Sequence, residues 1–131
     1  MSGEFQLQKA LFSAVSGLGY RAYDSAPQAE DGGSTATFPY VEVGAIVAAP
    51  FDTRSEVGFD AVARIHTRSR SAGMQECKTM QGVMYDRLHR GVLAVTGFNT
   101  ITIQRENSFC DRMADGTFHG VCEYRVMIEK Q

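Results

Sequence analysis

The sequence contains no tryptophan, only three prolines and three cysteines, and no long apolar run. No stretch approaches the roughly 20 consecutive apolar residues that a membrane-spanning helix needs, so we expect no membrane partner. The first residues show neither a basic segment nor a long apolar segment, which argues against a secretory signal. The cysteine count is odd and no C-x-x-C pair occurs, so we expect reduced cysteines and no zinc site.

An excess of charge of either sign is also missing. The chain has 15 acidic and 13 basic residues, a formal net charge of -2, and no strongly basic segment. A domain that reads nucleic acid normally presents a basic face, so the balance weakens that class of function. The apolar fraction of 44% and the charged fraction of 21% are those of an ordinary globular protein. A chain of 131 residues can bury one core, and we therefore expect residues 1–131 to form a single domain.

Catalytic signatures are absent from the sequence. It has no G-x-S-x-G elbow, no Walker A loop and no dinucleotide-binding glycine pattern. His66 and His119 could meet if their strands are neighbours, and Cys110 or Asp115 could then approach them. A strand histidine that bonds to a backbone carbonyl is far commoner than such a metal or Cys–His site. We therefore predict no catalytic residue, no metal and no cofactor.

Residues 4–18 are predicted to form an amphipathic helix. Their apolar positions recur at helical spacing and define one stripe that faces a core, namely Leu7, Ala10, Leu11, Ala14, Val15 and Leu18. Phe5 and Phe12 lie seven residues apart on a line well away from that stripe. They are either scattered surface aromatics or a subunit contact, because aromatic side chains are costly to leave in water.

Five further segments follow, up to about the middle of the chain. A short strand is predicted at 20–25, a strand at 40–48 that Pro50 closes, and a strand at 57–67 whose apolar residues alternate. The polar, glycine-rich segment 28–37 is predicted to be a mobile loop, and 50–56 a connector.

The second half of the chain predicts one helix and a hairpin. The helix is expected at 71–90, with Ser71 as its N-cap and Gly91 as the left-handed residue that ends it. Strands at 98–110 and 118–129 are joined through Asp115-Gly116, a strong hairpin signal. In the first of these strands Ile101 and Ile103 are predicted to share a buried face.

The order of these elements predicts the fold class. Two helices and a mostly antiparallel sheet form an α+β domain of two layers, in which the helices cover one face of the sheet.

The ordered local motifs resemble those of the small tail-completion (tail-terminator) proteins of long-tailed bacteriophages and gene-transfer particles. The resemblance runs from about Leu7 to Ile128 and rests on shared order and spacing. The motifs are Arg21-Ala-Tyr23-Asp24, Phe38-Pro39-Tyr40-Val41-x-Val43-Gly44, Phe51-Asp52, His66-Thr-Arg-Ser-Arg with Gly73, Tyr85-x-x-Leu88, and Asp115-Gly116-x-x-His119-Gly120.

The resemblance implies a curved sheet flanked by helices and a structural role in the virion. It implies a six-fold ring of identical subunits at the head-proximal end of the tail, assembled in the bacterial cytoplasm. Such a ring stops polymerisation of the tail tube and contacts the major tail tube protein and the head–tail connector. DNA passes through its lumen without sequence-specific binding.

Two alternatives stay open at this point. The chain could be a head-closure or tail-tube subunit, although tube subunits usually need long hairpins and only 98–129 offers one. It could also be a small enzyme that uses His66, Cys110 and His119, which would require those side chains to cluster in a pocket.

The segments 28–37 and 50–56 can become ordered on assembly, and they are therefore the natural contact elements of a ring. Together with the two helix aromatics they supply the residues predicted to form a subunit or partner interface, namely Phe5, Phe12, Glu30, Asp31, Phe51, Asp52 and Arg54.

Overall fold

The computed structural model describes residues 3–24, 38–52, 57–71 and 73–131. In chain order the elements are α1 (Gly3–Ser16), β1 (Arg21–Tyr23), β2 (Tyr40–Asp52), β3 (Val57–Ser69), α2 (Gln75–Leu88), β4 (Phe98–Arg112) and β5 (Phe118–Lys130). Segment 28–37, predicted to be a mobile loop, lies outside the described residues.

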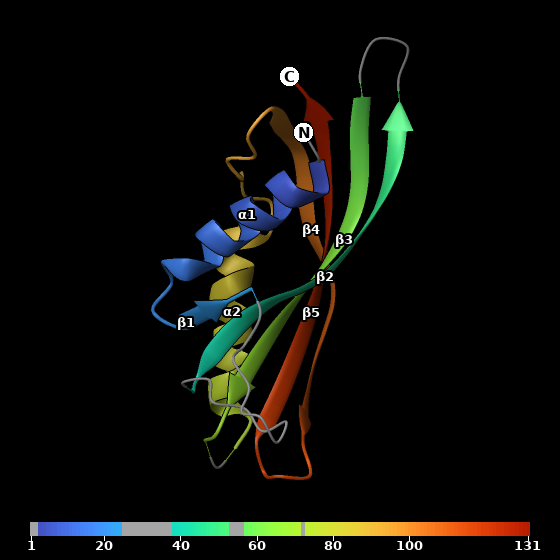
Figure 1. The fold of residues 1–131 in the computed structure, drawn as a ribbon. Helices are drawn as coiled ribbons and strands as arrows, with labels where there is room; N and C mark the ends of the chain where they lie inside the picture. The colour runs from blue at the N-terminus through green and yellow to red at the C-terminus, as the bar shows by residue number, and fades with distance from the viewer. Residues whose placement is uncertain (1–2, 25–37, 53–56, 72) are drawn as a thin grey trace, which may run out of the picture.

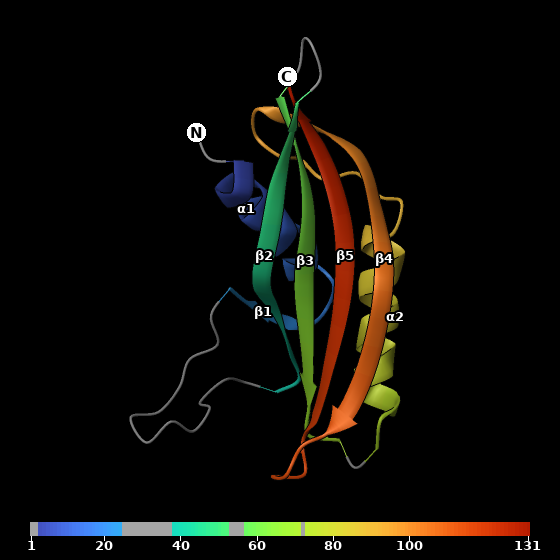
Figure 2. The ribbon, with the colours of Figure 1, turned by 90° about the vertical axis from the view of Figure 1, so that its right-hand side faces the viewer.

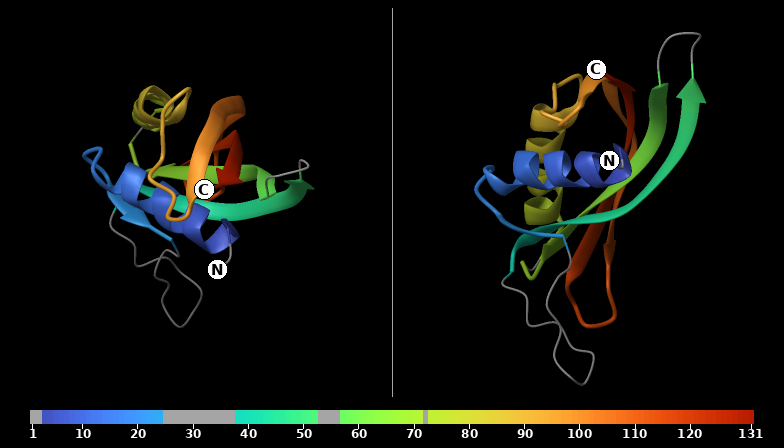
Figure 3. Two further views of the ribbon diagram at one scale, coloured as in Figure 1. Left: turned by 90° about the horizontal axis from the view of Figure 1, so that it is seen from above. Right: turned by 45° about the horizontal axis from the view of Figure 1, so that its top comes forward.

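The strands form one five-stranded sheet in the order β1-β2-β3-β5-β4. All neighbouring pairs are antiparallel except β1 and β2, which are parallel. Both helices lie on the same face of the sheet, α1 against β1 and β2, and α2 against β3, β4 and β5 (Figures 1 and 2). Figure 3 shows the sheet bending along its length. The predicted two-layer α+β fold is confirmed.

Helix α1 buries the stripe that its sequence predicts. Leu7, Leu11 and Val15 are almost completely buried against the core. Phe12, which we expected far from this stripe, is partly buried and packs against the same core, whereas Phe5 is 57% exposed. The two aromatic side chains therefore do not form one surface line.

Strand β2 continues beyond the predicted end and includes Pro50. Beyond its three-residue pairing with β1, β2 lies at the edge of the sheet, where a missing backbone N–H can face away from the ladder. Its pairing with β3 shifts register between Val43 and Ile46, a bulge that contains Gly44. A bulge and a proline both discourage another strand from adding to an open edge.

Helix α2 begins and ends differently from the prediction. Its N-cap is Met74 and not Ser71, and no side chain caps it. At the other end Arg90, not Gly91, has the positive φ, of 58°. A Cβ atom at Gly91 would lie 2.6 Å from the carbonyl oxygen of Arg87. Glycine is therefore required there for space and not for a left-handed backbone.

The β4–β5 hairpin closes at the predicted Asp115-Gly116 turn, where Gly116 has a φ of 87°. The backbone N–H of Thr117 donates a hydrogen bond of 3.0 Å to Oδ1 of Asp115, which fixes the turn. Ile103 is buried as predicted, but Ile101 is 48% exposed. The reason is a register shift between Thr100 and Thr102, which turns Ile101 out of the alternation.

Helix α2 approaches the sheet closely at Gly120. A Cβ atom there would lie 2.4 Å from Oγ1 of Thr67, 2.5 Å from Nε2 of Gln81 and 2.8 Å from Sγ of Cys77. Gln81 also donates a hydrogen bond of 2.7 Å to the carbonyl oxygen of Phe109 in β4. The absent side chain of Gly120 thus lets α2 rest directly on β3 and β5.

Within the described residues, neither helix has the length and apolar character needed to cross a bilayer.

Candidate assembly surface

The face of the sheet opposite the helices, here called the uncovered face, is the surface turned toward the viewer in Figure 2. The strand registers place alternate residues of β2, β3, β5 and β4 on it. On these strands its charged side chains are three arginines and six carboxylates: Arg64, Arg68, Arg125, Glu42, Asp60, Glu106, Asp111, Glu123 and Glu129. The face therefore carries slightly more negative than positive charge.

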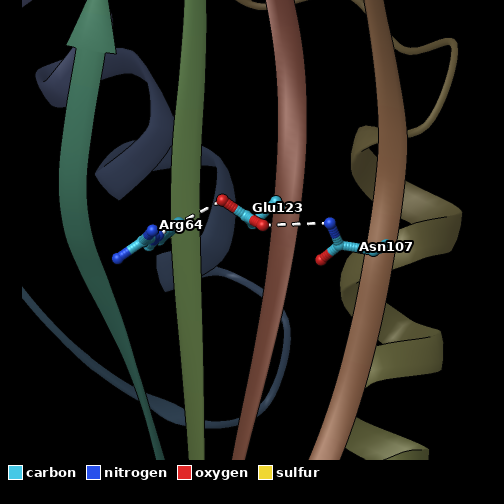
Figure 4. A network of polar contacts seen from close by, with 3 residues as sticks. All are labelled: Arg64, Asn107 and Glu123. Carbon is cyan, nitrogen blue, oxygen red and sulfur yellow. Dashed lines mark hydrogen bonds and ion pairs between the residues drawn. The ribbon is translucent and has the colours of Figure 1, made fainter.

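A polar network crosses three strands at the centre of this face (Figure 4). Oε2 of Glu123 lies 3.3 Å from Nε of Arg64 in β3, and Asn107 in β4 donates a 2.9 Å hydrogen bond to the other carboxylate oxygen. Asn107 and then Arg64 lower the pKa of Glu123. Since Arg64 is 55% and Glu123 28% exposed to solvent, the network organises the surface more than it stabilises the fold.

A second ion pair links the same central strands. Nε of Arg125 in β5 donates a 3.0 Å hydrogen bond to Oδ1 of Asp60 in β3, and its NH2 group binds Oδ2. The bidentate contact with Arg125 lowers the pKa of Asp60. Val47 and Ala49 of the edge strand line the groove beside this pair, and Val47 is 72% exposed. The apolar side chains of Val47 and Ala49 thus lie beside the Asp60–Arg125 ion pair in this groove.

His66 and His119 meet on the uncovered face, with 2.8 Å between Nδ1 of His66 and Nε2 of His119. Their ring centroids are 5.1 Å apart and their planes differ by 15°. Burial, opposed by Glu42 and reinforced by Arg68 and Arg64, lowers the pKa of His66. Burial and then Arg68 and His66 lower the pKa of His119 to about 4. Both rings are therefore neutral at pH 7.

The other side chains considered for a catalytic site do not join this pair. Cys110 of β4 lies opposite Gly120 of β5, on the helix side of the sheet. Burial and the neighbouring Cys77 thiol raise the pKa of Cys110 to about 12. Oδ1 of Asp115 accepts bonds from Thr117 in the hairpin turn. Within the described residues, no group of three or more His, Cys, Asp or Glu side chains is arranged to hold a metal ion.

All three cysteines are free thiols. Burial raises the pKa of Cys122 to about 11, so this thiol, like that of Cys110, is protonated at neutral pH. Cys122 lies across from Ser108 and not from Cys110. The hairpin therefore does not place the two cysteines opposite each other.

The predicted interface residues are dispersed over the fold. Phe5 is exposed on α1 with Nζ of Lys9 5.5 Å from its ring centroid, and Phe12 packs on the core. Phe51 and Asp52 end β2, opposite Gly58 and Val57 of β3. Glu30, Asp31 and Arg54 lie outside the described residues.

The sequence analysis did not single out Glu123 or Asn107, and it named Gly44 only as part of a motif. Glu123 meets Arg64 through the pairing of β3 with β5, two strands separated in sequence by α2 and β4, and it meets Asn107 through the pairing of β4 with β5. The alternation of charged residues at Arg64 and Glu123 was the available signal, but it becomes informative only once this register is known.

Comparison with known proteins gives a match over nearly the whole chain. The family model described as tail completion protein gp17 matches residues 8–129. The solved virion of a native gene transfer agent (GTA) particle contains a chain that is 19% identical, with a TM-score of 0.78 and 94% of each chain covered. At this identity the structural likeness shows a shared fold. No curated protein matches the chain.

Proposed function

Because the chain belongs to the tail completion protein gp17 family, a family of structural tail proteins, we propose that it forms a six-fold ring at the head-proximal end of a phage-type tail. The ring ends polymerisation of the tail tube and joins the tail to the head connector. The observation that carries this proposal is the family match across residues 8–129, which covers all of β1 to β4 and α2 and most of α1 and β5. The virion origin of a structure with the same fold supports it.

The charge of the uncovered face is compatible with passage of DNA through such a ring. Each phosphate that a protein neutralises adds salt-sensitive affinity, so a basic lumen would slow the moving DNA. Here six carboxylates oppose three arginines, and two of those arginines, Arg64 and Arg125, are held in ion pairs within the sheet. The uncovered face consequently lacks the strongly positive character that retains DNA.

A ring of identical subunits requires two different patches on each copy that fit one another. The ends of β2 and β3 farthest from α2 lie beyond both helices (Figures 1 and 3), and Val47 in this part of the sheet is largely exposed. On α1, Phe5 is a second exposed apolar group at some distance along the chain. We assign these two regions, together with Phe51 and Asp52, to subunit or partner contacts; Phe12 is left out because it packs on its own core.

The proposed function involves no catalysis. The three side chains of the enzyme alternative are split between two faces of the sheet, with His66 and His119 on the uncovered face and Cys110 on the helix side. A protonated thiol of pKa about 12 is a poor nucleophile at neutral pH. This geometry offers no pocket in which the three groups act on one substrate.

The proposal is tested by producing particles from which the chain is omitted and restoring it as a variant. Without the chain we expect tails of uncontrolled length that fail to join heads, and the unaltered chain should restore normal particles. Val47→Asp should leave the monomer folded, because Val47 is 72% exposed, but should weaken ring formation and particle yield. Val92→Asp, at a valine that is 75% exposed in the loop before β4, is the matched control and should assemble. Normal particles without the chain would contradict the proposal.

A further inference from the structure

We propose that the His66–His119 pair is an acid-sensitive contact: one hydrogen bond joins the two rings at neutral pH, and the rings separate once both carry a proton. This inference concerns the single chain and does not depend on ring assembly. It rests on the geometry of the two rings, on the room that Gly44 provides, and on the charges around them.

The two rings meet end to end and are not stacked face to face. The centre of an imidazole ring lies little more than 1 Å from each ring nitrogen, as bond lengths require. When two such rings are aligned along a contact of 2.8 Å, their centroids are therefore about 5 Å apart, and the observed separation is 5.1 Å. The planes differ by only 15°, so an N–H of one ring points along the lone pair of the other. A contact of this kind needs one nitrogen without a proton.

The bulge in β2 holds the far edge of the His66 ring. A Cβ atom at Gly44 would lie 2.4 Å from Nε2 and 2.6 Å from Cδ2 of His66. Gly44 does not have the positive φ that only glycine readily adopts, so its role is to leave space for the ring. The ring of His66 therefore reaches from Gly44 in β2 across β3 to His119 in β5.

Charged groups from each neighbouring strand surround the pair. Glu42 of β2 favours the protonated form of His66, and Asp111 of β4 favours that of His119. Arg68 of β3 opposes protonation of both rings, and Arg64 opposes that of His66. On β5 the nearest carboxylate on this face, Glu123, is bound to Arg64 and Asn107. The acidic groups do not balance burial and the arginines, so the neutral pair prevails at pH 7.

Protonation has two distinct steps in this arrangement. The first proton can be shared along the contact, because an imidazolium donates to a neutral imidazole. The second removes the only acceptor and places two positive charges side by side, so the contact breaks. Two imidazolium groups added to three arginines reduce the negative excess of the uncovered face.

The coupling between the rings can be measured by NMR of the histidine side chains between pH 8 and pH 4. We expect His66 and His119 to titrate below the ordinary value of 6.5, in two linked steps. In His119→Gln the titration midpoint of His66 should shift, since its partner no longer takes up a proton. A His66 titration curve that is the same in both proteins would overturn the proposal.

The contribution to stability has a defined sign. Both pKa values are lowered in the folded chain, so the unfolded chain binds protons first as the pH falls. The stability is therefore complete above about pH 6.5 and is lost as the pH falls toward 4. Between pH 7 and pH 5 the melting temperature of the parent should decrease more than that of a His66→Gln/His119→Gln double variant. Equal decreases would contradict the inference.

A double-mutant cycle tests the space at Gly44 independently. Gly44→Ala should lower the melting temperature of the parent, because the new methyl group displaces the His66 ring. In a His66→Ala background the same change should have little effect. Gly82→Ala, at a glycine with no atom within 4 Å of the added Cβ, is the control and should act equally in both backgrounds. An equal loss from Gly44→Ala in both backgrounds would show that the ring does not occupy this space.

Discussion

At the end of α2, Arg90 adopts a left-handed backbone and the glycine beside it does not. A left-handed conformation strains a residue that has a Cβ atom, and glycine relieves this strain. Arg90→Gly should therefore increase the free energy of unfolding by about 0.5 to 1 kcal/mol. Gly91→Ala should decrease it, because its Cβ atom would collide with the carbonyl oxygen of Arg87. Urea unfolding of both variants measures the two effects, and a stabilising Gly91→Ala would contradict this account.

Cys110 is partly accessible, and yet its thiol is predicted to be unreactive. Burial and the adjacent Cys77 raise its pKa to about 12, so at pH 8 almost none of it is the thiolate that reacts with alkylating agents. Alkylation by iodoacetamide, followed by mass spectrometry, should be far slower than that of glutathione and should accelerate only at strongly alkaline pH. Modification as fast as that of glutathione at pH 8 would show that the thiol is activated.

The packing of α2 on the sheet depends on a single glycine in β5. Gly120→Ala forces Thr67, Gln81 or Cys77 to move, and overpacking of this kind costs about 1 to 3 kcal/mol. Gly82→Ala within α2 meets no atom and serves as the matched control, in which stability should be unchanged or higher. Chemical denaturation compares the two variants. If Gly120→Ala proved as stable as the parent, the close contact between α2 and the sheet would be wrong.

Periodicity along the chain was sufficient to predict the helices, the hairpin and the apolar alternation of β3, because these features depend on near neighbours in sequence. Features that depend on distant strands were not predictable in the same way. Ile101 turns outward because of a bulge against β5, and Pro50 continues β2 because that strand lies at an edge. The predicted N-cap at Ser71 was wrong, because α2 begins only at Gln75; the backbone N–H of Ser71 instead donates a 3.1 Å hydrogen bond to Oγ of Ser69.

For the whole molecule, the order of weak motifs was more informative than any single one. It predicted the tail completion family that the match over residues 8–129 shows, although it did not place the surface groups. The meeting of His66 with His119 was only one of several possibilities, because the sequence does not reveal that β3 pairs with β5. The exposure of Phe5 and the burial of Phe12 likewise depend on how α1 rotates against β2.

The central claim is that the chain forms a ring at the head-proximal end of the tail. Cryo-electron microscopy of intact particles, with the fold of Figure 1 fitted into the density, tests it most directly. The account predicts six copies in one closed ring between the last layer of the tail tube and the head connector. Copies repeated along the whole tube, or particles that lack the chain altogether, would contradict it.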